Sequence, residues 1–539
     1  MLPPRRPRSH GSFAVRHSVD EEDWEAEMGV FRQRTLAPNQ LETLRKYEAG
    51  AVELGKVLFC QEGTALVTGL NNDAEPGTAL DFSSGAQGVL LWRTSAGAIF
   101  ALVLRESSPG VKAGDGVVCR LRAILQVVDD AVGATTKRDY VVDVPVGKCL
   151  EGRTWSPDQL LDWRGQSGQA AALPSITPGP RAPLLAAQIP MADREQIAEA
   201  LYTGVPCVDV LTPLGLGQSV QLSGRDAGER AALCQAVAHG ARLYLLCAAV
   251  AAGEAVRAAG GHALVILDSL APMVRAWGIL SAAAAQTPGA ALSSPDPASH
   301  VEVEGMLVSV GEAERRAFLS SLVQRAAKMD HRLGGGSLSL VLVGGGAAGP
   351  LLPTLIVEEL MSLTDGQMVV VRGEGGDAEE GPGSRLTLDP ALSVSRLGAR
   401  VFPPLLRPLA GQVRLELAQA RDAARFASDA EGLPGSRGAA RVEALTRTLS
   451  HRRGAAPVPL TRLALRLTLI ELLHDDPALA PGVSVEGVLR RCEGANALAP
   501  DLLRRMDRCG SGPEAEALLA ELREALRALV AQEPGHLSP

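Results

Sequence analysis

Residues 219–237, SVQLSGRDAGERAALCQAV, are the stretch whose residue types and spacing could do chemistry. An apolar strand, a glycine-containing turn and a helix start are typical of a phosphate loop, in which backbone N–H groups hold phosphates. Such a loop also needs a Lys for the β- and γ-phosphates and a Ser or Thr hydroxyl for magnesium. Gly228 fits the motif, but Ser223 occupies the position of its first glycine. Glu229 occupies the position of the lysine, and Arg230 that of the Ser or Thr hydroxyl. The pattern therefore predicts a degenerate phosphate site.

The charges at this loop oppose a nucleotide. A carboxylate at position 229 would repel a triphosphate by several kcal/mol in a partly dry site. Arg230 would offset part of that charge but cannot ligand magnesium, and Arg225 is the only nearby candidate for a substitute cation. Asp268 follows the apolar run HALVIL, where a magnesium-orienting carboxylate would stand. Two structural alternatives remain open: a plain strand–helix turn at the loop, and a helix cap at Asp268.

The elements that would position these residues fall into three regions. Between residues 55 and 121, short apolar runs recur about every ten residues, which predicts a small antiparallel barrel or sandwich. Between 186 and 400, strand-like and helical runs alternate, which predicts an α/β domain with a mostly parallel sheet. After residue 409, Leu, Ala, Arg and Glu at helical spacing predict a helical domain.

Composition is typical of a multidomain globular protein. The chain has 539 residues, a net charge of −8, 46% hydrophobic and 21% charged residues, which excludes wholesale disorder. This charge gives no general attraction to nucleic acid or to anionic membranes. The eight cysteines are scattered without a CxxC pair, so we expect reduced thiols and no metal site. The longest wholly apolar run is about half of a membrane span.

The first 49 residues combine a basic segment with a predicted helix. The segment carries four arginines and no acidic residue before Asp20, as in organelle transit peptides: Arg5, Arg6, Arg8 and Arg16. A disordered basic tail is the alternative.

Eight further strings carry a resemblance and occur along the chain in one order. They are FSSGAQG (82–88), VDVPVG (142–147), TGVPCVDVLTPLGLGQ (203–218), GEAVRAAGGHALVILD (253–268), QRAAKMDHRLGGGSL (324–338), LTDGQ (363–367), LSVSRLG (392–398) and LAGQVRLELAQ (409–419). From about residue 50 to 475 the sequence resembles the alpha subunit of the rotary proton-translocating ATP synthase. The resemblance implies an α/β RecA-like P-loop domain over 124–408, after an N-terminal antiparallel β-barrel over 50–123. A C-terminal α-helical domain would cover 409–539.

The same resemblance implies a function. Alpha subunits alternate with beta subunits in a hexameric ring around a gamma stalk, peripheral to the membrane through the complex. The alpha site binds Mg–ATP without turnover. The Arg of SVSR, here Arg396, acts as an arginine finger in the neighbouring beta site, where it neutralises charge on the transferring phosphoryl group. The structural alternative for Arg396 is a surface arginine that bonds locally.

Departures from the family gather at the nucleotide site. The family's GDRQTGKT reads SGRDAGER (223–230), the Gln-bearing adenine loop reads SHRRGAAP (450–457), and a helix-and-strand block before GEAVR is missing. We therefore expect no bound Mg–ATP and no metal. The leading hypothesis is a nucleotide-free alpha-type subunit with beta-type and gamma-type partners. It would lie on the matrix side of the mitochondrial inner membrane, with a plastid as the alternative. A pseudo-ATPase scaffold of another organellar complex and an active ATPase with an unusual loop are the other hypotheses.

Overall fold

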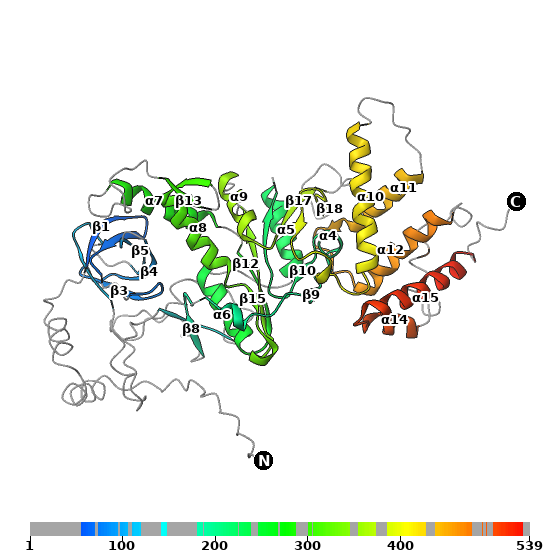
Figure 1. Ribbon diagram of the computed structural model, residues 1–539, viewed down its shortest axis with the longest axis horizontal. Coiled ribbons are helices and arrows are strands. Elements are labelled where there is room, and N and C mark those ends of the chain that lie inside the picture. Colours follow the sequence, from blue (N-terminus) through cyan, green and yellow to red (C-terminus); the bar gives the residue numbers. More distant parts are fainter. Residues whose placement is uncertain are drawn as a thin grey trace, which may run out of the picture. The chain divides into compact units, whose positions relative to one another are not determined.

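Figure 1 shows the fold as a computed structural model. The structure describes residues 55–70, 74–94, 97–105, 110–119, 142–147, 180–186, 188–224, 226–238, 246–267, 270–286, 300–303, 306–344, 354–372, 385–426, 437–476, 488, 492 and 500–531. The predicted transit peptide and helix in residues 1–49 lie outside these ranges. The chain divides into two compact units. The first comprises 1–150, 157–186 and 279–299, and the second comprises 151–156, 187–278 and 300–539.

A closed barrel of antiparallel strands forms the first unit. Around it the strands follow the order β1 (Gly55–Gln61), β2 (Thr64–Thr68), β5 (Ile99–Arg105), β4 (Gln87–Arg93), β3 (Ala79–Phe82) and β6 (Gly116–Cys119). Leu80, Leu90 and Ile99 are fully buried in its interior. Gly88 allows close strand contact, because a Cβ there would lie 2.6 Å from the carbonyl oxygen of Leu102. The predicted antiparallel barrel is confirmed. Two short strands, β7 (Asp143–Pro145) and β8 (Arg181–Pro183), pair in the same unit.

An eight-stranded sheet forms the body of the second unit. Its order is β12-β16-β11-β17-β18-β20, with β15 beside β16 and β19 beside β17. The strands are β11 (Ser219–Ser223), β12 (His262–Leu267), β15 (Ala327–Lys328), β16 (Ser337–Val343), β17 (Gly366–Arg372), β18 (Arg385–Leu388), β19 (Val394–Ser395) and β20 (His451–Arg452). The four strands β12, β16, β11 and β17 run parallel, as predicted. The other four pair antiparallel, so the predicted parallel character holds only for the centre of the sheet.

Apolar side chains cover both faces of this sheet. All seven residues of β16 are buried, as expected for a parallel strand covered on two sides. Its alternate residues enter different cores: Leu340 and Leu342 pack with α8 and α9, and Val341 and Val343 pack with the core that extends into the helical region. The period of two along the strand thus separates two hydrophobic layers.

The remaining elements of the second unit surround the sheet. They are η3 (Met191–Asp193), β9 (Ala200–Leu201), α4 (Pro206–Leu211), β10 (Leu214–Gly215), α5 (Ala227–Ala238), α6 (Leu246–Ala258), α7 (Ala271–Gln286, which continues into the first unit), β13 (His300–Val303), β14 (Met306–Ser309), α8 (Val310–Val323), η4 (His331–Leu333), α9 (Thr354–Leu363) and η5 (Gly398–Val401). Within the described ranges, every helix is too short or too polar to cross a bilayer.

Helices follow the sheet toward the C-terminus, as predicted: α10 (Arg407–Phe426), α11 (Arg437–Leu449), α12 (Leu460–Asp475), α14 (Pro500–Asp507) and α15 (Gly512–Val530).

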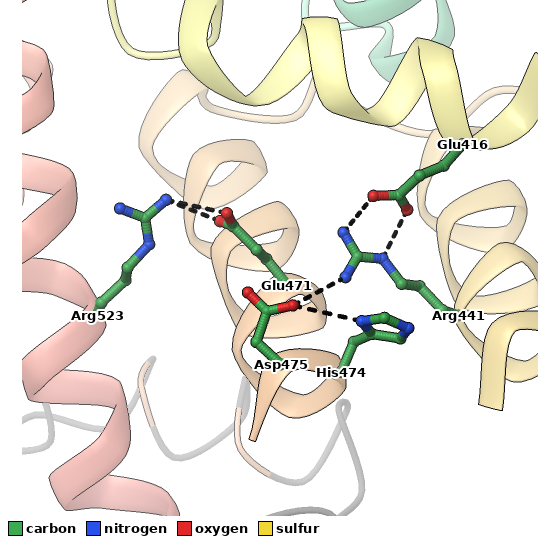
Figure 2. A network of polar contacts seen from close by, with 6 residues as sticks. All are labelled: Glu416, Arg441, Glu471, His474, Asp475 and Arg523. Atoms are coloured by element: carbon green, nitrogen blue, oxygen red, sulfur yellow. Dashed lines mark hydrogen bonds and ion pairs between the residues drawn. The ribbon is translucent and has the colours of Figure 1, made fainter. Parts of the chain in front are cut away.

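Figure 2 shows the ion pairs that join four of them. Arg441 of α11 binds Glu416 of α10, with its Nε 2.6 Å from Oε2, and lies 3.5 Å from Asp475 of α12. Arg523 of α15 lies 2.9 Å from Glu471 of α12. These directional pairs fix how the helices are oriented around a core that is mainly leucine.

Candidate functional site

The phosphate-loop sequence does fold as a strand, a turn and a helix. β11 lies between the parallel strands β16 and β17, so the turn after it opens at the carboxyl end of the sheet, where α/β proteins bind ligands. Ser223 is the last residue of β11, and Gly224 follows it. Gly224 is needed there, because a Cβ would lie 2.7 Å from the carbonyl oxygen of Val370. Gly228 lies in the first turn of α5.

A carboxylate of the chain itself satisfies the N-terminus of α5. The Oδ1 atom of Asp226 accepts a hydrogen bond of 2.8 Å from the backbone N–H of Glu229. An acidic side chain at this end of a helix is favoured by the unpaired N–H groups and by the helix dipole. Those are the same features that hold a phosphate. Asp226 thus provides internally the negative charge that a ligand would bring.

Glu229 is paired. Its Oε1 accepts from Nε of Arg372, at the end of β17, over 3.2 Å. The Glu229 side chain is 13% exposed and that of Arg372 is 42% exposed. At the lysine position of a phosphate loop, the chain therefore has a carboxylate neutralised by an arginine from the neighbouring strand.

Arg230 points back into the loop. It is 1% exposed, and its Nη1 donates to the carbonyl oxygen of Gly224 over 2.6 Å. A charged donor bound to a backbone carbonyl is a strong contact, and it joins the first residue of the turn to the helix. The position that carries a magnesium-binding hydroxyl in a working loop is filled here by a buried cation.

The other residues predicted for the nucleotide site are only partly placed. Arg225 and Asp268 lie outside the described residues. The loop at 450–457, predicted at the base pocket, begins with β20 and brings Arg453 beside α5. Its Nη1 lies 3.9 Å from the point where a Cβ on Gly228 would stand. Gly228, Glu229 and Arg230 thus lie in one turn of α5, and Arg453 of the 450–457 loop lies beside it.

Arg396 is exposed and bonds elsewhere. Its backbone N–H donates to the carbonyl oxygen of Asp365 over 2.8 Å. Its guanidinium donates to the carbonyl oxygens of Met361 and Ser362, at the end of α9, over 2.8 and 2.9 Å. A cation at this end of a helix is favoured by the dipole. The structure thus places Arg396 at α9 and away from the contacts of the 224–230 loop.

Three features were missed in the sequence, two of them at the loop and one elsewhere in the second unit. Asp226 could have been found, because Asp three residues before Glu resembles a capping box. Arg372 could not, because it meets Glu229 across 143 residues of chain. The third is Asp209 of α4, which is 1% exposed and accepts from the backbone N–H and hydroxyl of Thr203 over 2.9 Å each. Burial raises the pKa of Asp209 to about 7.

Within the described ranges, no group of three or more His, Cys, Asp or Glu side chains could hold a metal ion. The groups that the loop offers to a ligand are therefore arginines and carboxylates, which already bind one another or the backbone. This arrangement can stabilise the turn without a ligand.

Comparison with known proteins agrees with the fold. No protein-family model matches the chain. ATP synthase subunit alpha 2 of Burkholderia thailandensis is 29% identical over 408 residues, which cover 68% of this chain and 66%, just under two thirds, of that protein. ATP synthase subunit alpha 3 of Paraburkholderia xenovorans is 28% identical over 472 residues, covering 80% and 82% of the two chains. The alpha subunit of Macrococcus caseolyticus is 26% identical over 440 residues, covering 71% and 76%. The chain is therefore a divergent relative of the ATP synthase alpha subunits.

Proposed function

We propose that this protein is a non-catalytic alpha-type subunit in the soluble head of a proton-translocating rotary ATP synthase. The proposal is supported by the similarity to alpha subunits over most of the chain, and by a barrel and a parallel-centred sheet in the expected order. Beta-type and gamma-type subunits would be its partners, and the protein would reach the membrane only through the complex.

We further propose that its own site does not hold Mg–ATP. The observation that carries this proposal is the buried Arg230, which closes the turn on the carbonyl oxygen of Gly224. A triphosphate would also meet the carboxylates of Asp226 and Glu229. Magnesium binds oxygen ligands with strict geometry, and a guanidinium supplies none. The residues present therefore do not fit the cofactor, and the subunit's role would be structural.

In this proposal Arg396 is the residue that contributes to catalysis, in a neighbouring subunit. Arg396 is exposed and directly follows β19, so its guanidinium can meet a partner by leaving the carbonyl oxygens of Met361 and Ser362. A cation that meets the transferring phosphoryl group stabilises the negative charge of the transition state.

A second candidate is a pseudo-ATPase scaffold in another organellar complex. It is favoured by the missing helix-and-strand block before residue 253, which lies near subunit contacts in the family. The two candidates differ in partners. The proposed location, a mitochondrion or a plastid, is common to both and rests on the arginine-rich N-terminus.

Two measurements test the proposal. Titration calorimetry of the purified protein should detect no binding of Mg–ATP up to millimolar concentration, and tight binding would contradict the degenerate site. Affinity purification of the tagged chain from its own cells should recover beta-type and gamma-type subunits. Recovery of an unrelated complex without them would favour the scaffold.

A further inference from the structure

The backbone of Arg396 is bound to Asp365, which follows α9 and the buried Thr364. The carbonyl oxygen of Asp365 accepts from the backbone N–H of Arg396 over 2.8 Å. On the neighbouring pair of β17 and β19, Gly366 lies opposite Ser395. A Cβ on Gly366 would lie 2.7 Å from the carbonyl oxygen of Val394, so the two segments are in close contact. The backbone of Arg396 therefore follows the position of Asp365.

The carboxylate of Asp365 is in turn anchored to β11. Its Oδ2 accepts from the backbone N–H of Ser219 over 2.9 Å and from the Ser219 hydroxyl over 2.8 Å. The backbone N–H of Asp365 donates to the carbonyl oxygen of Ser219 over 2.9 Å. Ser219 is 3% exposed, so these bonds are sheltered from water. β11 is a central strand of the sheet, and it gives Asp365 a rigid support.

The guanidinium of Arg396 has a second support on the same segment. It donates to the carbonyl oxygens of Met361 and Ser362 near the end of α9, four and three residues before Asp365. The backbone and the side chain of Arg396 are thus both hydrogen-bonded to the segment 361–365. That turn is held by the Asp365 carboxylate, so a shift of this turn would move both ends of Arg396.

We propose that Asp365 is a positioning residue for Arg396, and that its bonds to Ser219 set where the arginine is presented to a neighbouring subunit. This inference rests on the proposed function. Asp365 has no part in the chemistry, because its carboxylate is engaged with β11. Its role is to hold the arginine in register with a phosphoryl group that another chain binds. Asp365, in LTDGQ, is hydrogen-bonded both to Ser219, which follows GLGQ, and to Arg396 of LSVSRLG.

The structure predicts the effect of Asp365→Asn in two assays. The Asn oxygen can still accept from Ser219, but it carries no negative charge, so both hydrogen bonds weaken and the turn loosens. In the isolated full chain, the backbone N–H of Arg396 should exchange with solvent faster than in the wild type. In the assembled complex, kcat for ATP hydrolysis should fall about 10- to 100-fold with KM little changed, as misplaced catalytic groups cause.

A double variant separates positioning from general stability. Asp365→Asn should slow a complex that already carries Arg396→Ala no further, because the residue acts only through the arginine. Ser219→Ala is the milder variant, since it keeps the backbone donor, and it should give a smaller loss of the same kind. Asp330→Asn is the matched control. Asp330 also accepts from a backbone N–H, that of Arg332 over 2.8 Å, but it lies in the η4 turn. It should change neither assay.

The outcomes that overturn the inference are distinct from failure of the proposed function. The inference is overturned by an unchanged exchange rate at Arg396 in Asp365→Asn. It is also overturned by equal losses from Asp365→Asn in the wild-type and Arg396→Ala complexes. If Arg396→Ala itself leaves hydrolysis unchanged, the arginine finger of the proposed function fails and this inference fails with it.

Discussion

The carboxylate of Glu229 lies 3.2 Å from Nε of Arg372, so the residue at the lysine position of the phosphate loop is neutralised from within the sheet. Arg230 and Asp226 complete the turn with bonds of 2.6 and 2.8 Å to the backbone. Each of these three loop charges, Asp226, Glu229 and Arg230, therefore meets an opposite charge or a backbone group of the same chain. The loop keeps the geometry of a phosphate site while its own side chains replace the ligand.

Restoring the missing groups should restore binding. We expect Glu229→Lys combined with Arg230→Thr to bind Mg–ATP more tightly than the wild type by about 10- to 100-fold. The reason is the charge-assisted hydrogen bond of a lysine, worth about 1.5–3 kcal/mol, together with a hydroxyl for magnesium. Titration calorimetry on variants whose folding is verified by circular dichroism measures this. Glu229→Gln with Arg230→Ala is the control, because it removes the same charges without adding ligands. Equal affinity in the two variants would refute the explanation.

Removal of Arg396 should slow hydrolysis in an assembled complex that contains this chain. An arginine finger contributes about 10³-fold or more to kcat, so Arg396→Ala should cause a loss of that order. Steady-state hydrolysis by the purified complex measures it. Arg400→Ala is the control, since Arg400 is exposed in the same connection four residues later. An unchanged rate in Arg396→Ala would leave the arginine with its contact to α9 as a structural role only.

The ion pairs of the helical region should differ in their effect on stability. The Arg441 side chain is 8% exposed and that of Arg523 is 36% exposed. Arg441→Ala leaves Glu416 partly buried without its partner, which should lower the free energy of unfolding by about 3 kcal/mol. The Arg523 end of its pair is open to water, so Arg523→Ala should cost less, about 1 kcal/mol, even though Glu471 is 15% exposed against 20% for Glu416. Urea unfolding of both variants measures the difference. Equal costs would show that burial does not decide the strength of these pairs.

Stability should depend on pH through Asp209. Burial raises the pKa of this carboxyl from 3.8 to about 7, so the native state holds a proton that the unfolded state releases. The contribution of this group to stability is therefore fully present below pH 4 and is lost as the pH rises from 4 to 7. The free energy of unfolding should fall by up to about 4 kcal/mol over that range. Asp209→Asn keeps an oxygen for Thr203 and should remove this slope. Urea unfolding at several pH values compares the variant with the wild type.

Asp330→Asn provides the opposite control for this slope. Hydrogen bonds from Arg332 lower the pKa of Asp330, so its contribution is present above the usual carboxyl pKa and lost in acid. Its substitution should leave the slope between pH 4 and 7 unchanged. The assignment to Asp209 would be wrong if Asp209→Asn kept the wild-type slope in that range.

The sequence by itself determined the order of barrel, α/β sheet and helices, because the periods of apolar residues reflect how each element buries its side chains. It also determined the resemblance to alpha subunits and the loss of the phosphate lysine, since both are properties of residue identity at fixed spacing. The antiparallel strands β18 and β20 were not predicted, because strand direction at a sheet edge depends on connections and not on periodicity.

Only the tertiary structure decided which partners the charged residues of the loop and of the Arg396 support bind. Glu229 meets Arg372, and Asp365 meets Ser219, across 143 and 146 residues of chain. Local patterns carry no information on such pairs, which form when parallel strands place distant segments side by side. The residue types showed that the loop had lost its ligands. The fold showed that Arg230 and Asp226 bind the backbone of the turn in their place, because buried charges and helix ends must find partners.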